Sequence, residues 1–119
     1  MHEYSIVQSL VDSVAAAVGA RHASVHEVRV AVHEVRISIG EMSGVDCGLL
    51  TTAYEVFRAG TLCERASLAI DRIPANWQCP RCQVAIANGA FLRCAACNEP
   101  AQLASGDEII LQRIELEVA

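Results

Sequence analysis

Apolar residues recur at three- and four-residue steps near the start of the chain and predict a helix over residues 3–18. Its predicted buried positions are Ile6, Val7, Leu10, Val11, Val14 and Val18. Gly19 is expected to end this helix, and Glu3 falls in its first turn, where the helix dipole favours a carboxylate. A second helix is predicted over residues 47–59, with Asp46 as its N-cap and Gly60 after its end. The predicted apolar face of this second helix comprises Leu49, Leu50, Ala53, Tyr54, Val56 and Phe57.

Three further apolar segments predict strands over residues 25–39, 66–73 and 108–118. The first contains a tandem repeat, VHEVRVA at 25–31 and VHEVRIS at 32–38. Because the period of seven is odd, a regular strand would turn the apolar residues of the two copies to opposite faces. We therefore expect either a bulge near His33 or an arrangement in which one copy leaves the strand, as in a swapped homodimer. A similar change of parity in the last strand predicts a bulge near Gln112.

Between the last two predicted strands lie two C-x-x-C pairs, Cys79 with Cys82 and Cys94 with Cys97, separated by eleven residues. Two such turns can supply the four sulfurs of a tetrahedral Zn(II) site, in which each Zn–S bond is about 2.3 Å. Pro80 and the Asn88-Gly89 step are turn formers, as a hairpin between the two pairs requires. An all-cysteine site has no open position for water, which favours a structural role. Two disulfides, four free thiols or bound iron are the alternatives for these cysteines.

These elements predict an α+β fold with two helices packed on a three-stranded mixed sheet and an inserted four-cysteine zinc ribbon. The expected domains are residues 1–76 plus 106–119, which form the α+β domain, and residues 77–105, which form the zinc ribbon.

Charge and composition exclude several classes of protein. The net charge is −5, and the nine basic residues are all arginines scattered along the chain, so no basic stripe is present for nucleic acid. The longest apolar run is too short for a membrane span, and the start lacks the pattern of a signal peptide. We therefore expect a cytoplasmic protein with reduced thiols.

The remaining cysteines and three of the four histidines have simpler interpretations. Cys47 and Cys63 flank the second predicted helix and are expected to be free thiols without the neighbouring charges of an activated nucleophile. His26 and His33 are seven apart and face opposite ways in a strand, so both are expected in solvent, as is His22 in a polar turn.

The first residues, Met1-His2-Glu3, can form a second metal site. A bulky second residue is expected to preserve Met1, so that the α-amine, the His2 amide and the His2 imidazole follow one another. These nitrogens can close fused chelate rings around Ni(II) or Cu(II). An isolated histidine at this position is otherwise an ordinary surface residue.

Together, Met1-His2-Glu3, the segment Ile39-Gly40-Glu41-Met42-Ser43-Gly44-Val45 and the late cysteine pairs resemble the HypA/HybF family of hydrogenase nickel-incorporation proteins. The terminal Ile-Glu-Leu-Glu-Val fits this family too, and the second VHEVR copy resembles a seven-residue insertion before the Ile-Gly-Glu loop.

The resemblance implies a nickel metallochaperone with structural zinc, in which His2 is the main Ni(II) ligand and the Met1 amine and Glu3 are possible further ligands. It also implies two partners, a nickel-handling GTPase of the HypB type and the large subunit of nickel–iron hydrogenase. The alternative is a zinc-ribbon adaptor that binds protein without a nickel role. An enzyme is not expected, because the chain has no H-E-x-x-H set for a zinc hydrolase, and a C-x-x-C redox protein would have to be free of zinc.

Overall fold

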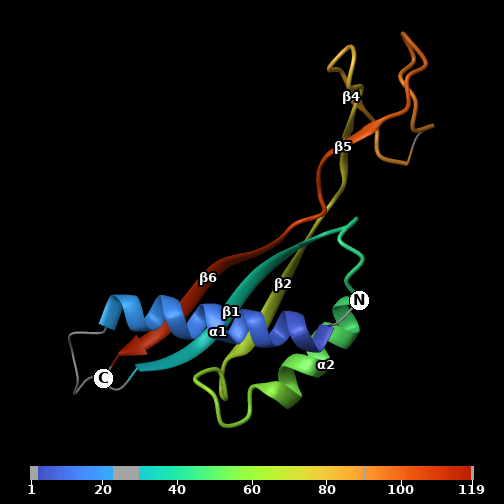
Figure 1. Cartoon of the computed structure of the whole chain (residues 1–119). Coiled ribbons are helices and arrows are strands. Elements are labelled where there is room, and N and C mark those ends of the chain that lie inside the picture. The colour runs from blue at the N-terminus through green and yellow to red at the C-terminus, as the bar shows by residue number, and fades with distance from the viewer. Residues whose placement is uncertain (1–2, 23–29, 90, 119) are drawn as a thin grey trace. The chain divides into compact units, whose positions relative to one another are not determined.

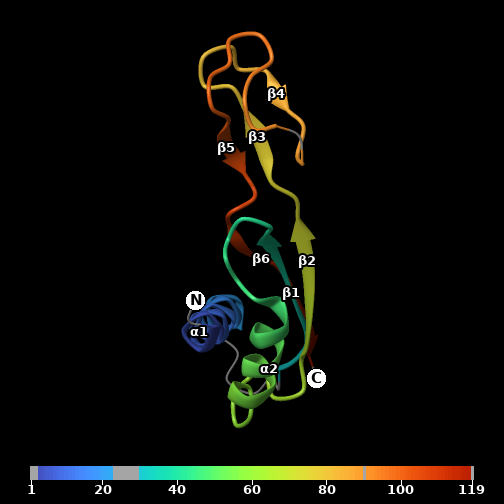
Figure 2. The same cartoon turned by 90° about the vertical axis from the view of Figure 1, so that its right-hand side faces the viewer.

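The computed structural model describes residues 3–22, 30–89 and 91–118. Its elements, in chain order, are α1 (Glu3–His22), β1 (Val30–Gly40), α2 (Cys47–Phe57), β2 (Ser67–Ile73), β3 (Asn76–Gln78), β4 (Ala85–Ile86), β5 (Gln102–Ser105) and β6 (Ile109–Val118). They form two three-stranded sheets, one in the order β2-β1-β6 and the other in the order β4-β3-β5. The first sheet is mixed, and both helices cover the same face of it (Figures 1 and 2). The predicted α+β architecture, with the cysteine-rich segment inserted before the last strand, is therefore confirmed.

The chain divides into two compact units. The first comprises residues 1–37, 45–71 and 111–119, and the second comprises residues 38–44 and 72–110. We call the second the zinc-ribbon unit, because it contains all four cysteines of the C-x-x-C pairs.

The core of the first unit is built from one stripe of α1, the inward face of β1 and two residues of α2. The buried apolar side chains on these three elements are Val7, Leu10, Val11, Val14, Val18, Val32, Val35, Ile37, Leu50 and Tyr54, and Cys63 and Ala66, which follow α2, are fully buried as well. The three- and four-residue steps of α1 are those expected for a helix that turns one stripe toward a sheet. At its start, α1 packs against the end of α2 through an edge-to-face contact between Tyr4 and Phe57, whose ring centres are 5.6 Å apart.

Two details of the helices differ from the prediction. The first helix does not stop at Gly19 but continues to His22, which is therefore the last residue of α1 and not part of a turn. Gly19 has no heavy atom within 4 Å of an added Cβ and no left-handed backbone, so it is an ordinary helical residue. In a helix interior a glycine costs only about 1 kcal/mol, which the packed stripe tolerates.

The second helix begins at Cys47 as predicted, and part of its predicted apolar face is exposed. Asp46 caps it, because its Oδ1 accepts a hydrogen bond of 3.0 Å from the Leu49 amide. Leu50 and Tyr54 are buried, but Leu49 and Val56 are 59% and 60% exposed, so only part of the predicted apolar face is buried. Helical geometry turns positions 49 and 56, which are two turns apart, to the same outer side.

The change of parity in β1 is confirmed by burial. Val32 and Val35 are both buried although they are three residues apart, and burial then alternates through Ile37. A regular strand would turn residues three apart to opposite faces. The phase therefore changes at residues 33 and 34, where a bulge was predicted; the first VHEVR copy, including His26, lies mostly outside the described residues. In β6 the same shift separates Leu111, which is half-buried, from half-buried Ile114 and Leu116.

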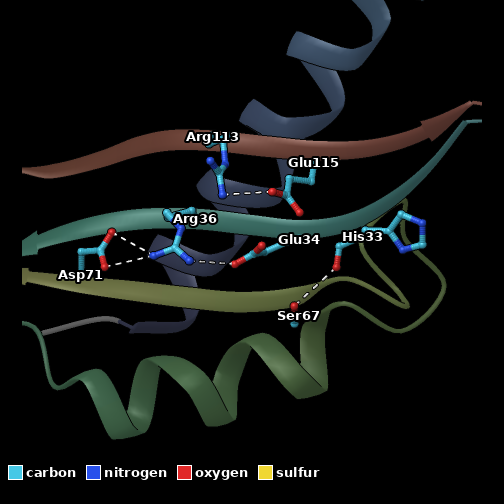
Figure 3. A network of polar contacts seen from close by, with 7 residues as sticks. All are labelled: His33, Glu34, Arg36, Ser67, Asp71, Arg113 and Glu115. Atoms are coloured by element: carbon cyan, nitrogen blue, oxygen red, sulfur yellow. Dashed lines mark hydrogen bonds and ion pairs between the residues drawn. The ribbon is translucent and has the colours of Figure 1, made fainter.

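The other face of the first sheet carries charged pairs. Arg36 of β1 donates to Asp71 of β2 at 3.1 Å and to Glu34 at 3.2 Å, and Figure 3 shows these side chains on the side of the strands away from α1. The carboxylate of Asp71 raises the pKa of Arg36 further above its ordinary value. His33 is 56% exposed and contacts Glu117 at 2.9 Å, so its expected place in solvent is confirmed. Among the described residues, no helix is long and apolar enough to cross a bilayer.

Candidate metal centre

The four cysteines of the C-x-x-C pairs come together at one point of the zinc-ribbon unit. Their Sγ atoms all lie within 4.8 Å of one another, and those of Cys79 and Cys97 are 3.5 Å apart. Tetrahedral zinc with bonds of about 2.3 Å places its sulfurs roughly 3.8 Å apart, so this spacing fits a single ion. Iron in a four-sulfur site has a similar geometry, so the spacing is common to zinc and iron.

Each cysteine pair is held by the same set of backbone hydrogen bonds. In the first, the Cys79 amide donates to the Val84 carbonyl and the Gln83 amide donates to the Cys79 carbonyl, both at 2.9 Å. The second pair repeats this pattern fifteen residues later, in Cys94, Asn98 and Glu99: the Cys94 amide donates to the Glu99 carbonyl, and the Asn98 amide donates to the Cys94 carbonyl.

Both turns also end in a left-handed residue, Gln83 with φ 59° and Asn98 with φ 60°. Residues other than glycine adopt this backbone conformation at a cost of about 1 kcal/mol. Its occurrence at matching positions indicates that the two loops have the same backbone shape for the same structural reason. Here that shape turns two thiols of each loop toward the other loop.

Burial and hydrogen bonding make the four thiols unequal. Cys79 and Cys94 are buried, Cys97 is half-buried and Cys82 is exposed. The Cys82 amide donates to the Cys79 sulfur at 3.3 Å, and this bond is the main reason that the pKa of Cys79 is lowered to about 7. Contacts with the sulfurs of Cys97 and Cys79 raise the pKa of Cys82 to about 12. A thiol with a lowered pKa is ready to serve as a thiolate ligand at neutral pH.

All six cysteines are free thiols, which removes the disulfide alternative for this structure. Cys63 is fully buried, and burial raises the pKa of its thiol, as expected for an inert side chain. Cys47 is half-buried at the first position of α2. The four clustered cysteines are the only metal-binding group of three or more His, Cys, Asp or Glu residues found within the described ranges.

Glu41, a residue of the Ile-Gly-Glu loop for which no individual role was predicted, links two parts of the zinc-ribbon unit by hydrogen bonds. One carboxylate oxygen of Glu41 accepts a hydrogen bond from the Ala75 amide and another from the Asn88 side chain, each at 3.0 Å. These two bonds, the Ala75 bond most of all, lower the pKa of the Glu41 carboxyl. Glu41 thus connects Ala75, just before β3, with Asn88, in the turn that follows β4. We call these two hydrogen bonds the Glu41 tie.

Close backbone crossings explain the glycines around Glu41. A Cβ on Gly40 would lie 2.2 Å from the backbone of Gly106, and one on Gly106 would lie 2.6 Å from the Cα of Ala75. Gly106 also has φ 109°, a conformation that side chains rarely adopt. In the sequence, the only hint of this crossing is the presence of Gly40 before Glu41 and of Gly106 after Ser105. A sequence alone does not show which backbone segments cross.

The predicted nickel ligands lie at the start of the chain, where the described residues begin at Glu3. Met1 and His2 lie outside the described residues, whereas Glu3 is the first residue of α1 and is half-buried. Their arrangement around a metal therefore stays a prediction.

Comparisons with known proteins give a consistent family. Residues 1–116 match the family model described as hydrogenase/urease nickel incorporation, metallochaperone, HypA. The hydrogenase maturation factor HypA of Shewanella oneidensis is 34% identical over 122 residues, covering 100% of this chain and 98% of that protein. The corresponding factor of Wolinella succinogenes is also 34% identical, covering 98% of this chain and 96% of its own.

Solved structures show the same likeness. The solution structure of the nickel metallochaperone HypA from Helicobacter pylori matches with a TM-score of 0.64 at 30% identity, covering 97% of each chain. Another solution structure of a HypA protein matches with a TM-score of 0.71 at 26% identity, covering 98% of this chain and 97% of the other.

Proposed function

Because the chain belongs to the HypA family of nickel-incorporation metallochaperones, we propose that it binds Ni(II) at its N-terminus and delivers it during maturation of nickel–iron hydrogenase. The observation that carries the proposal is the family match over residues 1–116, which includes Met1-His2-Glu3, whose Glu3 is the first residue of α1. The proposed ligands are the His2 imidazole and amide and the Met1 amine, with Glu3 as a further candidate.

The start of α1 supports nickel binding by backbone nitrogens. The first four amides of a helix have no partner within the helix, so an amide near Glu3 can be given to a metal without loss of helical hydrogen bonds. The positive end of the helix dipole also favours negative charge, including that of a deprotonated amide nitrogen. Planar nitrogen donors are those that Ni(II) prefers.

The four clustered cysteines are proposed to hold Zn(II) in a closed structural site. All-sulfur coordination suits zinc, and the four ligands leave no position for a substrate. Bound zinc would hold the two cysteine loops together, while the chain itself supplies the matching loop hydrogen bonds and the Glu41 tie. The family is one of nickel-incorporation metallochaperones, and we propose that this chain likewise handles metal without catalysing a reaction.

We further propose a cytoplasmic location and two partners, a GTPase of the HypB type and the hydrogenase large subunit. These follow from the family resemblance. The curated relatives are described as hydrogenase maturation factors, which supports hydrogenase as the client.

A nickel titration of untagged protein with an authentic Met1, beside the His2→Ala variant, tests the proposal. We expect one equivalent of nickel with a d–d absorption band typical of square-planar nitrogen coordination, and loss of that band in the variant. His33→Ala is the matched control, because His33 is exposed on the sheet and should leave the band unchanged. Equal nickel binding by wild type and His2→Ala would favour the zinc-ribbon adaptor without a nickel role.

A further inference from the structure

The short strand β4 forms an edge of the zinc-ribbon sheet. Its register pairs Gln78 with Ala85 and Trp77 with Ile86, and the Cys79 amide donates to Val84 one step further along. Hydrogen-bonded and non-hydrogen-bonded pairs alternate in an antiparallel ladder, so Val84 and Ile86 bond toward β3 and the backbone N–H and C=O of Ala85 face outward. Ala85 is exposed, and β4 has no second neighbouring strand within the part of the chain that the structure describes. Figure 2 shows β4 beside β3 at this edge.

Two grooves border β4. One, of about 580 Å³, is lined by Val84, Phe91 and Arg93 among others, and the second, of about 490 Å³, is lined by Trp77, Gln83 and Asn88 among others. Both grooves include Ala85, Ile86 and Ala87 in their walls. The side chains of an added strand would alternate between the two faces of the sheet, and the small alanines leave room for them.

Two large apolar side chains in the wall of the first groove are exposed to solvent. Phe91 is 85% exposed and Val84 is 50% exposed. Aromatic side chains at such positions are typical anchors of protein interfaces.

Charge identifies the kind of partner. Arg93 is the only charged side chain among the residues that line the two grooves. Arg93 lines the groove, and its Nη1 donates to the Asn98 carbonyl at 2.9 Å, which orients the guanidinium and leaves its other N–H groups for a carboxylate. The edge of a second copy, residues 83–88, contains no carboxylate and offers Arg93 no ionic partner, so self-pairing is disfavoured.

We propose that β4 is a docking edge for an extended peptide segment of a partner protein, added as a strand beside Ala85 and carrying apolar side chains that alternate with carboxylates. Strand addition of this kind obtains affinity from main-chain hydrogen bonds and specificity from the grooves beside the edge. The proposal concerns the zinc-ribbon unit alone and does not depend on nickel binding.

The test uses the full, zinc-loaded chain labelled with ¹⁵N and a blocked synthetic hexapeptide of alternating valine and glutamate. We expect amide shift changes confined to residues 83–88 and 91–93 and slower hydrogen exchange at Ala85. A peptide with lysine in place of glutamate should bind about tenfold more weakly, because it places like charge beside Arg93.

Three variants locate the interaction. Ala85→Pro removes only the outward amide and should weaken binding about tenfold, since proline is tolerated at a strand edge where its N–H would face solvent. Arg93→Glu should weaken binding of the glutamate peptide about fivefold. Arg65→Glu is the matched charge reversal outside the zinc-ribbon unit, at an exposed residue, and should leave binding unchanged.

Several results would overturn the proposal. These are no shift changes at millimolar peptide, equal binding of both peptides, or unchanged binding by Ala85→Pro. Shift changes in β4 that depend on protein concentration without peptide would assign the edge to a second copy of the chain and would also contradict it. If Ala85→Pro loses zinc, the comparison of Arg93→Glu with Arg65→Glu decides the question.

Discussion

The two proposed metal sites of this protein are built in opposite ways. The proposed zinc ligands come from two loops fifteen residues apart, and matching backbone hydrogen bonds shape both loops. The proposed nickel ligands are consecutive in sequence and end at Glu3, the first residue of α1, so the fold contributes little to bringing them together. A resident structural ion benefits from a closed site formed by folding, whereas a cargo ion has to be bound and released at an accessible one.

Among the substitutions considered, removing one proposed zinc ligand should cause the largest loss of structure, and it should be confined to the zinc-ribbon unit. Cys79→Ala or Cys94→Ala takes away a buried thiolate, and structural zinc contributes about 10–16 kcal/mol in small zinc-dependent folds. We expect zinc content to fall close to zero and the NMR signals of residues 76–105 to lose dispersion, while α1 and α2 retain theirs. Zinc analysis and a ¹⁵N spectrum measure this.

Cys47→Ala is the matched control for the ligand variants, because it removes a half-buried thiol outside the cysteine cluster. It should keep one zinc per chain. Full zinc content in the Cys79 variant would refute the four-cysteine site.

Alanine substitutions at two glycines should change the free energy of unfolding in opposite directions, because Gly40 lies against another backbone segment and Gly19 has open space beside it. Gly40→Ala forces a Cβ against the Gly106 backbone and should lower the free energy of unfolding by about 2–4 kcal/mol. Gly19→Ala has open space in a helix interior and should raise it by about 0.5–1 kcal/mol. Urea denaturation measures both, and equal effects of the two substitutions would contradict the backbone crossing.

The Glu41 tie predicts a dependence of stability on pH. Its carboxyl has a pKa below the ordinary value in the folded protein, so the stabilisation is present above the unfolded pKa and is lost as the pH falls through the folded one. Glu41→Gln should therefore flatten the decline in stability below about pH 4.5. Denaturation curves from pH 6 down to pH 3, recorded beside the exposed-helix control Glu55→Gln, measure the difference. A decline identical to that of wild type would show that the two hydrogen bonds of Glu41 contribute nothing.

A small loss of stability is expected in the first unit, at Tyr54. Its buried hydroxyl donates to the Ala66 carbonyl at 2.9 Å, and burial raises its pKa. Tyr54→Phe should cost only about 1 kcal/mol, since Arg58 also donates to that carbonyl and keeps it satisfied. Thermal unfolding measures this, with the half-exposed Tyr4→Phe as control. A loss as large as that of Gly40→Ala would mean that Arg58 does not substitute for the hydroxyl.

Local patterns predicted most of the fold because the features that specify it are local. The steps of Val7, Val11 and Val14 specify α1, the Asp46 cap specifies the start of α2, and the odd repeat specifies the phase change of β1. The end of α1 was predicted wrongly, because packing, and not the glycine itself, determines whether a helix continues through a glycine such as Gly19.

The candidate site was predictable only in part. The spacing of the four cysteines identified the cluster, since C-x-x-C turns are themselves local. The role of Glu41 could not be predicted, because its partners Ala75 and Asn88 are 34 and 47 residues away in the chain. The outward amide of Ala85 likewise follows from a strand register that the sequence does not specify.

X-ray absorption at both metal edges, on protein loaded with one zinc and one nickel, tests the central claim most directly. The account predicts four sulfur neighbours for zinc at about 2.3 Å and only nitrogen and oxygen neighbours for nickel. Sulfur neighbours at the nickel edge would place nickel among the cysteines and contradict the division of the two metals between two kinds of site.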